Sequence, residues 1–183
     1  AQGLAADGWQ LLDAAILAVF VALFARAALS AASAAIGLAW RPPASPSPGA
    51  RPAGRTALLL PVHNEETSRV FATAEATREA LLAAGLGDRF DIFLLSDSTD
   101  AEALAREAEA VALLRLRAAS GIFYCRRGTN AGRKAGNIAH WVRRHGGAYP
   151  HFVVLDADSV MEAETLRLLA LAMEADPRAG LIQ

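Results

Sequence analysis

The apolar residues of this chain follow two patterns, one continuous and one interrupted. Residues 14–39 contain a single formal charge, Arg26, and the tryptophans Trp9 and Trp40 flank this run. A helix from Trp9 to Trp40 would rise roughly 46 Å at about 1.5 Å per residue, close to the full bilayer with its interfaces. Aromatic residues are common at those interfaces. The pattern predicts one transmembrane helix within residues 1–40.

Arg26 is the unfavourable residue in this helix, because a cation near mid-bilayer costs roughly 2.5 to 3.5 kcal/mol on insertion scales. Arg26, Ser30, Ser33 and Gly37 share one helical face. Stripes of small and polar residues are where membrane helices pack together. We therefore expect further transmembrane helices to cover this face. A kinked or interfacial helix is the alternative.

The flanks of the helix predict its orientation. No Lys or Arg precedes it, whereas Arg41, Arg51 and Arg55 follow it. Because positive charges favour the cytoplasmic side, the downstream region is expected in the cytoplasm. A cleaved signal peptide fits less well, since the run is long and its flank carries Asp7 and Asp13 rather than basic residues.

The interrupted pattern begins after residues 41–55, a segment with five prolines that predicts an extended linker. From residue 56 onward, short apolar runs alternate with helix-forming segments. Such alternation is typical of an α/β fold, a mostly parallel sheet with helices on both faces, whose ligands bind at the carboxyl ends of the strands. The expected strands are 57–60, 90–95, 122–125, 152–155 and 180–182, and the expected helices are 67–84, 101–118, 130–144 and 162–175.

Composition narrows the classes of function. At 183 residues and 54% hydrophobic content, the chain can bury one sizeable core. A net charge of −1 argues against a nucleic-acid partner. The single cysteine, Cys125, excludes an intrachain disulfide and agrees with a reducing compartment. We expect a buried, unreactive thiol, because no base is evident beside it.

Two carboxylates end the apolar run 152–155. Asp156 and Asp158 project to one side if the extended geometry persists beyond the strand. Hard oxygen ligands in this position suit Mg²⁺ or Mn²⁺ together with substrate phosphates. A solvated turn, in which Asp156 or Ser159 caps the next helix, is the alternative.

Three other polar clusters follow strands and should share the same edge. Glu65 and Glu66 follow the first strand, where acids also act as helix-dipole partners. Asp97 follows the second strand and can accept a hydrogen bond from a base edge. Residues 126–137 form a glycine-punctuated basic loop before a helix. That environment fits a diphosphate, although a solvated loop is equally consistent with it.

Four motifs in this order, LLLPVHNEE, LLSDSTD, FYCRRGTNAGRKAGNIAHW and VVLDADSVM, resemble the donor-binding half of an inverting family 2 glycosyltransferase with a GT-A fold. The sequence is most similar to the membrane glucosyltransferases that make osmoregulated periplasmic glucans. The resemblance covers about residues 56–183. It implies transfer of glucose from UDP-glucose to a growing glucan, with a β-1,2 backbone, on the cytoplasmic side of a bacterial inner membrane.

The resemblance also implies roles for individual residues. Asp97 would bind the uracil, and Glu65 would line the nucleoside pocket. Lys134 and Asn137 would lie along the donor diphosphate and sugar. His63 occupies a variable place in its motif and receives no chemical role.

At the metal, the resemblance places Asp156 and Asp158, with Asp158 the direct ligand. It places the general base, an acceptor-gripping motif and further transmembrane helices beyond Gln183. We therefore expect this chain to be a piece that holds UDP or donor without elongating glucan. A nucleotidyl- or phosphoryl-transferase on a similar sheet and a non-catalytic, membrane-tethered nucleotide-binding module are the alternatives.

Overall fold

A computed structural model describes residues 2–39, 47, 49–117, 120–157 and 159–182. The chain divides into two compact units, residues 1–45 and 46–183. Several residues named in the predictions lie outside the described ones: Trp40, residues 41–46 and 48 of the proline-rich segment, and Asp158.

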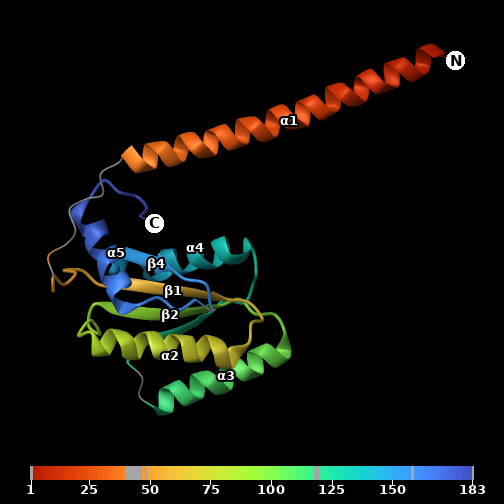
Figure 1. The fold of residues 1–183 in the computed structure, drawn as a ribbon. Helices are drawn as coiled ribbons and strands as arrows, with labels where there is room; N and C mark the ends of the chain where they lie inside the picture. Colours follow the sequence, from red (N-terminus) through yellow and green to blue (C-terminus); the bar gives the residue numbers. More distant parts are fainter. Residues whose placement is uncertain (1, 40–46, 48, 118–119, 158, 183) are drawn as a thin grey trace. The chain divides into compact units, whose positions relative to one another are not determined.

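The first unit is helix α1, Gln2–Ala39 (Figure 1). Its segment Leu12–Gly37 is long and apolar enough to cross a membrane, by length and composition. Large apolar side chains such as Phe24 are exposed along it, and exposed apolar surface of this extent marks a site for lipid or for other protein. The hydroxyl of Ser33 donates to the backbone O of Leu29 at 2.9 Å, which satisfies it within the helix. Packing of the Arg26 face on other helices stays a prediction.

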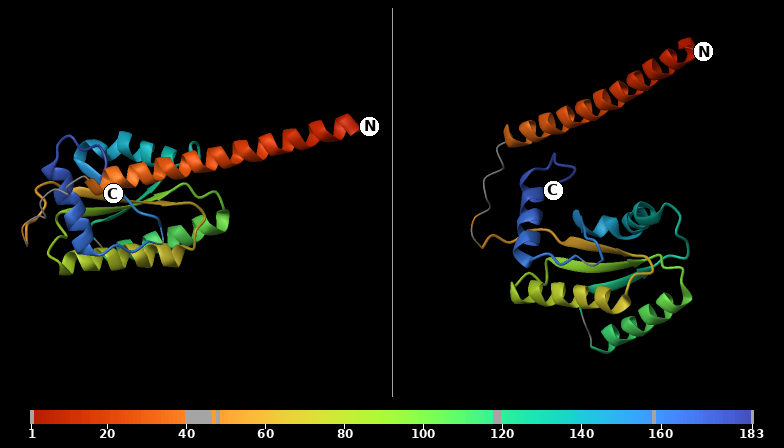
Figure 2. Two further views of the ribbon diagram at one scale, coloured as in Figure 1. Left: turned by 45° about the horizontal axis from the view of Figure 1, so that its top comes forward. Right: turned by 45° about the vertical axis from the view of Figure 1, so that its right-hand side comes forward.

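The second unit is a four-stranded parallel sheet in the order β3-β2-β1-β4, with helices on both faces (Figures 1 and 2). Since β4 lies on the far side of β1 from β2, the strand order reverses beside β1, where open α/β sheets bind ligands. The elements are β1 Thr56–Val62, α2 Thr67–Ala83, β2 Phe90–Ser96, α3 Ala101–Leu116, β3 Ile122–Arg126, α4 Arg133–His145, η1 Gly146–Ala148, β4 His151–Val154 and α5 Ala163–Ala175.

Alternation along the strands divides the core into two layers. Leu58 and Leu60 of β1 pack in the larger layer with residues of α2, α3 and α5. Leu59 packs in the smaller layer with Phe93 of β2 and Trp141 of α4. The sheet is therefore apolar on both faces, as parallel sheets require. Both layers leave the carboxyl ends of the strands open.

The α/β fold predicted from the sequence is confirmed, with element boundaries that differ from the expected ones by only a few residues. One expected strand is absent: residues 180–182 make no strand, and Leu181 is 75% exposed. A run of three residues offers few ladder hydrogen bonds, and β4 is paired in the structure only with β1.

Residues 50–55, expected to belong to the linker, are part of the second unit and contact α5. The backbone N–H groups of Ala53 and Gly54 donate to the carboxylate of Glu174 on α5 at 3.0 and 2.8 Å. Extended proline-rich backbone leaves such donors unpaired, so an acceptor on a neighbouring helix holds them. The contacts of the second unit thus begin before β1.

Candidate functional site

A cavity of about 760 Å³ lies at the carboxyl ends of β1, β2 and β4. Four segments far apart in the sequence meet around it: the loops after β1, β2 and β4, and the start of α4. The sequence predicted that polar clusters would converge on this edge, and they do. The lining residues are Pro61, Val62, His63, Glu65, Glu66, Arg69, Val70, Asp97, Asn130, Arg133, Lys134, Asp156 and Ala157.

Asp97 is the buried acid of the cavity. Its side chain is 4% exposed, and its Oδ2 accepts a hydrogen bond from Nη2 of Arg127 at 2.6 Å. The Arg127 side chain is itself only 8% exposed. It also donates to the backbone O of Ala131 and of Arg133, both at 2.8 Å. One buried guanidinium therefore connects the acid after β2 to the basic loop before α4.

His63 covers the other side of Asp97. Its Nδ1 lies 3.1 Å from the backbone O of Asp97 and 3.4 Å from Oδ1 of the same residue. The amide nitrogen of Asn130 lies 3.3 Å from its Nε2. An amide N–H can only donate, so with Asn130 donating to Nε2, the Nδ1–H of His63 donates to the backbone O of Asp97. Oδ2 of Asp97 is thus bonded to Arg127, whereas Oδ1 has the longer contact with His63.

Asn64 joins the loops after β1 and β2. Its backbone has a positive φ of 59°, a conformation that Asn tolerates better than most residues. Its Oδ1 accepts from the backbone N–H groups of Thr99 and Asp100 at 2.9 and 3.0 Å, and its own N–H donates to Oγ of Ser98 at 2.9 Å. The shape of this rim is thereby set by hydrogen bonds rather than by apolar packing.

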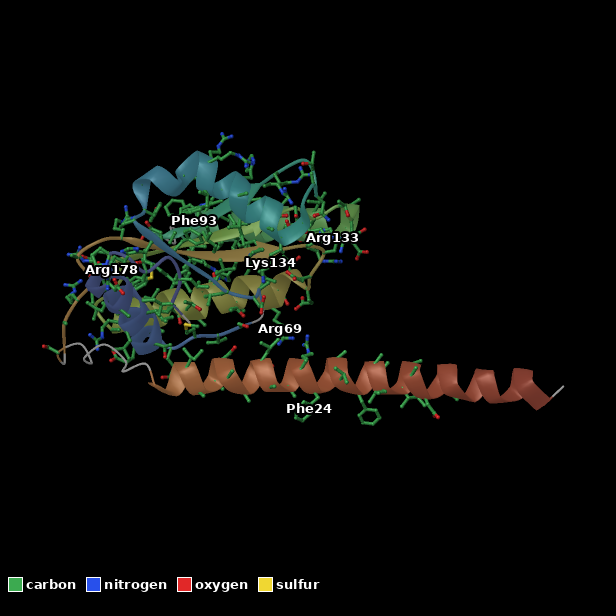
Figure 3. All side chains as sticks on the ribbon, turned by 90° about the horizontal axis from the view of Figure 1, so that it is seen from above. Phe24, Arg69, Phe93, Arg133, Lys134 and Arg178 are labelled. Carbon is green, nitrogen blue, oxygen red and sulfur yellow. The ribbon has the colours of Figure 1, made fainter. Side chains whose placement is uncertain are left out.

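The start of α4 brings positive charge to the cavity. Gly132 precedes the helix with a φ of +71°, and Arg133 follows with a φ of 48°. Arg133 and Lys134 stand in the first turn (Figure 3), which contains no acidic residue. Helix N-termini present unpaired N–H groups and a partial positive charge. Together these groups form a site suited to an anion such as a diphosphate.

Gly136 allows this loop to close tightly. A Cβ at this position would lie 2.1 Å from the backbone O of Ala131 and 3.0 Å from Nη1 of Arg127. Only glycine fits at this position without displacing the backbone of Ala131. Close packing therefore explains this glycine of the loop.

Asp156 and Lys134 form an ion pair across the mouth of the cavity. The hydrogen bond and the charge of Lys134 lower the pKa of Asp156 below its usual value. Both side chains are well exposed, so the pair contributes little to stability. A cation already occupies one oxygen of this carboxylate.

The extended geometry that would align Asp156 with Asp158 does not persist. Strand β4 ends at Val154, and the backbone N–H of Ser159 donates to the backbone O of Asp156 at 3.0 Å, so the chain turns directly after Asp156. The cause lies in β1, where Pro61 has no N–H with which to continue the ladder. Strand alternation therefore does not decide where Asp158 points.

Fit to a divalent cation rests on the chemistry of the donors. Asp156 offers a carboxylate at the cavity, and its ion pair with Lys134 shows that this oxygen can receive a positive charge. Carboxylate oxygens suit Mg²⁺ or Mn²⁺, which commonly take one or two carboxylates together with substrate phosphates. Among the residues that the structure describes, no group of three or more His, Cys, Asp or Glu side chains could hold a metal without such phosphates.

Three other predicted residues have definite places. Glu65 lines the cavity, and its Oε2 accepts from the backbone N–H of His63 at 3.4 Å. Glu66 caps α2 through Ser68 and the next residue, and the hydrogen bond from the Ser68 hydroxyl is the main cause of its lowered pKa. Asn137 is buried outside the cavity lining and donates to the backbone O of Leu95 at 2.7 Å. Its predicted donor contact stays a prediction.

Sequence reasoning missed Arg127, Asn64 and Glu107. Arg127 was visible only as one of several basic residues in a loop, and Asn64 only as part of a motif. Glu107 lies in the middle of α3, where a carboxylate normally faces solvent, yet it is 1% exposed. No periodicity marked it, because its partners come from other elements.

Both tyrosines of the chain have pKa values raised to about 12. Burial is the main cause in each, followed by a hydrogen bond to a carboxylate: Glu107 for Tyr124 and Asp91 for Tyr149. The folded state holds these protons more tightly than the unfolded state does. Their contribution to stability is therefore complete below about pH 10 and is lost as the pH rises towards 12.

We expect the tyrosinate absorbance of the folded chain to stay low at pH 10 and to rise only near pH 12. The unfolded chain in guanidinium chloride should titrate near 10, the ordinary value. Ultraviolet titration of both states checks this. A folded chain in which either tyrosine titrates near 10 contradicts the buried hydrogen bonds.

The sheet and cavity define an α/β protein whose cavity lies where the strand order reverses beside β1, the place where open α/β sheets bind ligands. Comparison with known proteins is more specific: residues 58–183 match the model of glycosyl transferase family 2. The chain belongs to this family.

Similar curated proteins share one description, glucans biosynthesis glucosyltransferase H. The protein of Xanthomonas euvesicatoria pv. vesicatoria is 44% identical over 190 residues, which cover 97% of this chain and 29% of that protein. The protein of Xylella fastidiosa is 45% identical, covering 96% of this chain and 29% of its own length. The protein of Vibrio cholerae serotype O1 is 45% identical, covering 94% and 24%. The chain thus spans less than a third of these relatives.

Proposed function

We propose that this chain is the donor-binding part of a membrane glucosyltransferase that transfers glucose from UDP-glucose to a growing glucan. The observation that carries this proposal is the cavity itself, where a buried carboxylate stands at one end and a basic helix start with an acidic partner stands at the other. A nucleoside diphosphate has matching groups: a base with an N–H edge and a doubly charged diphosphate.

Recognition of the base falls to Asp97. Uracil has an N–H at position 3 that can donate a hydrogen bond to Oδ1 of Asp97. Cytosine has an acceptor nitrogen at that position, so it would place one acceptor against another. Arg127 holds the carboxylate through its Oδ2, and His63 contacts the backbone O of the same residue. A hydrogen bond to a charged group is worth roughly 1.5 to 3 kcal/mol, enough to select one pyrimidine over the other.

The start of α4 binds the diphosphate in this proposal. Lys134 and the positive end of the α4 dipole are the anion-binding elements, and Glu65 lines the nucleoside side of the cavity. Asp156 and Asp158 would hold Mg²⁺ or Mn²⁺, which when bound offsets negative charge on the departing UDP. We assign donor binding to this chain and no general base to its described residues.

The membrane assignment rests on α1. The helix is long enough to span a bilayer, and the arginines after it favour a cytoplasmic location for the second unit. We propose that this location is the inner membrane of a bacterium and that the acceptor is a β-1,2-linked glucan. Further transmembrane helices would cover the face that contains Arg26.

Titration of nucleotides against the full 183-residue chain in detergent, with Mg²⁺, tests this function. We expect UDP-glucose and UDP to bind and CTP and ATP to bind at least about tenfold more weakly, a difference of 1.4 kcal/mol. Equal or tighter binding of CTP or ATP would instead favour a nucleotidyl- or phosphoryl-transferase. Isothermal titration calorimetry gives the affinities directly.

A further inference from the structure

Glu107 is a buried carboxylate to which donor binding assigns no role. It lies on α3, outside the cavity, and is 1% exposed. Its two oxygens accept three hydrogen bonds of 2.6 Å, from the hydroxyls of Ser96, Ser98 and Tyr124. Removing a carboxylate from water costs several kcal/mol unless such bonds compensate. A carboxylate buried with three donors is a costly arrangement where an apolar residue would pack.

The position of two of these donors points to a purpose. Ser96 and Ser98 are the immediate neighbours of Asp97, and side chains alternate in an extended segment. The two hydroxyls therefore face α3 together while the Asp97 carboxylate faces the cavity. Because Glu107 binds both hydroxyls at once, it fixes the backbone on either side of Asp97.

The same network reaches the loop after β1. The hydroxyl of Ser98, which donates to Glu107, also accepts from the backbone N–H of Asn64 at 2.9 Å. Tyr124 adds an anchor on β3, so Glu107 connects β2, β3 and both loops of the rim. Rotation of the segment 96–98 would break the bonds of both serine hydroxyls to Glu107 together.

We propose that Glu107 is a positioning residue that aims Asp97 at the base of the bound nucleotide. This inference rests on the proposed function for the identity of the base. Glu107 touches no ligand and acts through Ser96 and Ser98. It thereby sets base selectivity from the far side of the strand.

The substitution Glu107→Gln tests this role. Glutamine has nearly the same shape, but one of its two polar atoms is a donor, so it cannot accept from both serines as the carboxylate does. We expect UDP affinity to fall about tenfold, as for one lost hydrogen bond to a charged group, and the preference for UDP over CDP to shrink. Both affinities are measured by calorimetry on the full chain.

Leu114→Ala is the matched control. Leu114 is 8% exposed and lies on the same helix, two turns beyond Glu107. Its apolar side chain forms no hydrogen bond with either serine. Its loss leaves a cavity in the core and should lower the melting temperature, with the ratio of UDP to CDP affinity unchanged. A Glu107→Gln variant that lowers stability but keeps that ratio would reduce Glu107 to a structural residue and overturn the inference.

A second measurement does not depend on the nucleotide. Hydrogen exchange of the backbone amides of residues 96–100 should accelerate in Glu107→Gln and stay slow in Leu114→Ala, because only the first variant releases this segment. If the unaltered chain bound no UDP, the proposed function would fail, and amide exchange would still decide whether Glu107 holds the segment around Asp97. Unchanged exchange would overturn the positioning role in either case.

Discussion

Replacing Asp97 with Ala is expected to abolish selective UDP binding and to destabilise the fold. The carboxylate is 4% exposed and is paired with a guanidinium that is 8% exposed, so its removal leaves Arg127 buried without its counter-charge. Breaking a buried ion pair by removing one partner costs about 3 to 5 kcal/mol. Remaining bonds from Arg127 to two backbone carbonyls favour the lower end of that range. Denaturant unfolding gives the stability, and calorimetry gives the affinity.

Asp97→Asn separates binding from stability. The amide keeps the shape and one acceptor oxygen for Arg127, and it brings an N–H that can donate to N3 of cytosine. We expect UDP to bind roughly thirtyfold more weakly, corresponding to about 2 kcal/mol, with the preference over CDP lost or reversed.

Asp100→Ala is the control in the same loop. Asp100 caps α3 by accepting from the N–H of Ala103 at 3.0 Å, and loss of such a cap costs about 1 kcal/mol. This variant should be slightly less stable and bind UDP normally. An Asp97→Asn chain that keeps the original affinity and base preference would remove Asp97 from the base site.

Replacing Asp158 with Ala is expected to remove the dependence of UDP binding on a divalent cation. In the unaltered chain, chelation of Mg²⁺ or Mn²⁺ should weaken UDP binding at least about tenfold, because the diphosphate loses its main counter-charge. Asp158→Ala should bind UDP with this lower affinity whether or not the cation is present. Glu109→Ala, which removes an exposed acid on α3, should retain the full effect.

Lys134→Gln is expected to change Mn²⁺ affinity and UDP affinity in opposite directions. The ammonium of Lys134 occupies one oxygen of Asp156, so its removal should strengthen Mn²⁺ binding in the absence of nucleotide while weakening UDP binding. Paramagnetic relaxation measures Mn²⁺ affinity without any assay of activity. Weaker Mn²⁺ binding in Lys134→Gln would show that the two cations do not compete for this carboxylate.

Much of the fold could be predicted because its determinants are local. The alternation of short apolar runs with helical segments predicted β1 to β4 and α2 to α5, and the carboxyl ends of parallel strands necessarily share an edge. Asp97, Lys134, Glu65 and Asp156 were therefore expected together, and they line one cavity. The run 180–182 failed as a strand because a strand needs a partner as well as a pattern.

Local order along the chain was thus determined by the sequence itself: which segments are helices or strands, which polar residues follow them, and which family the motifs resemble. Only the tertiary structure decided the pairings, because a hydrogen bond between distant segments leaves no periodic trace. Arg127 donates to Asp97, 30 residues away in the sequence, and Glu107 accepts from Ser96, 11 residues away. Burial makes these partners obligatory, since a charge removed from water must find its counter-charge or its donors nearby.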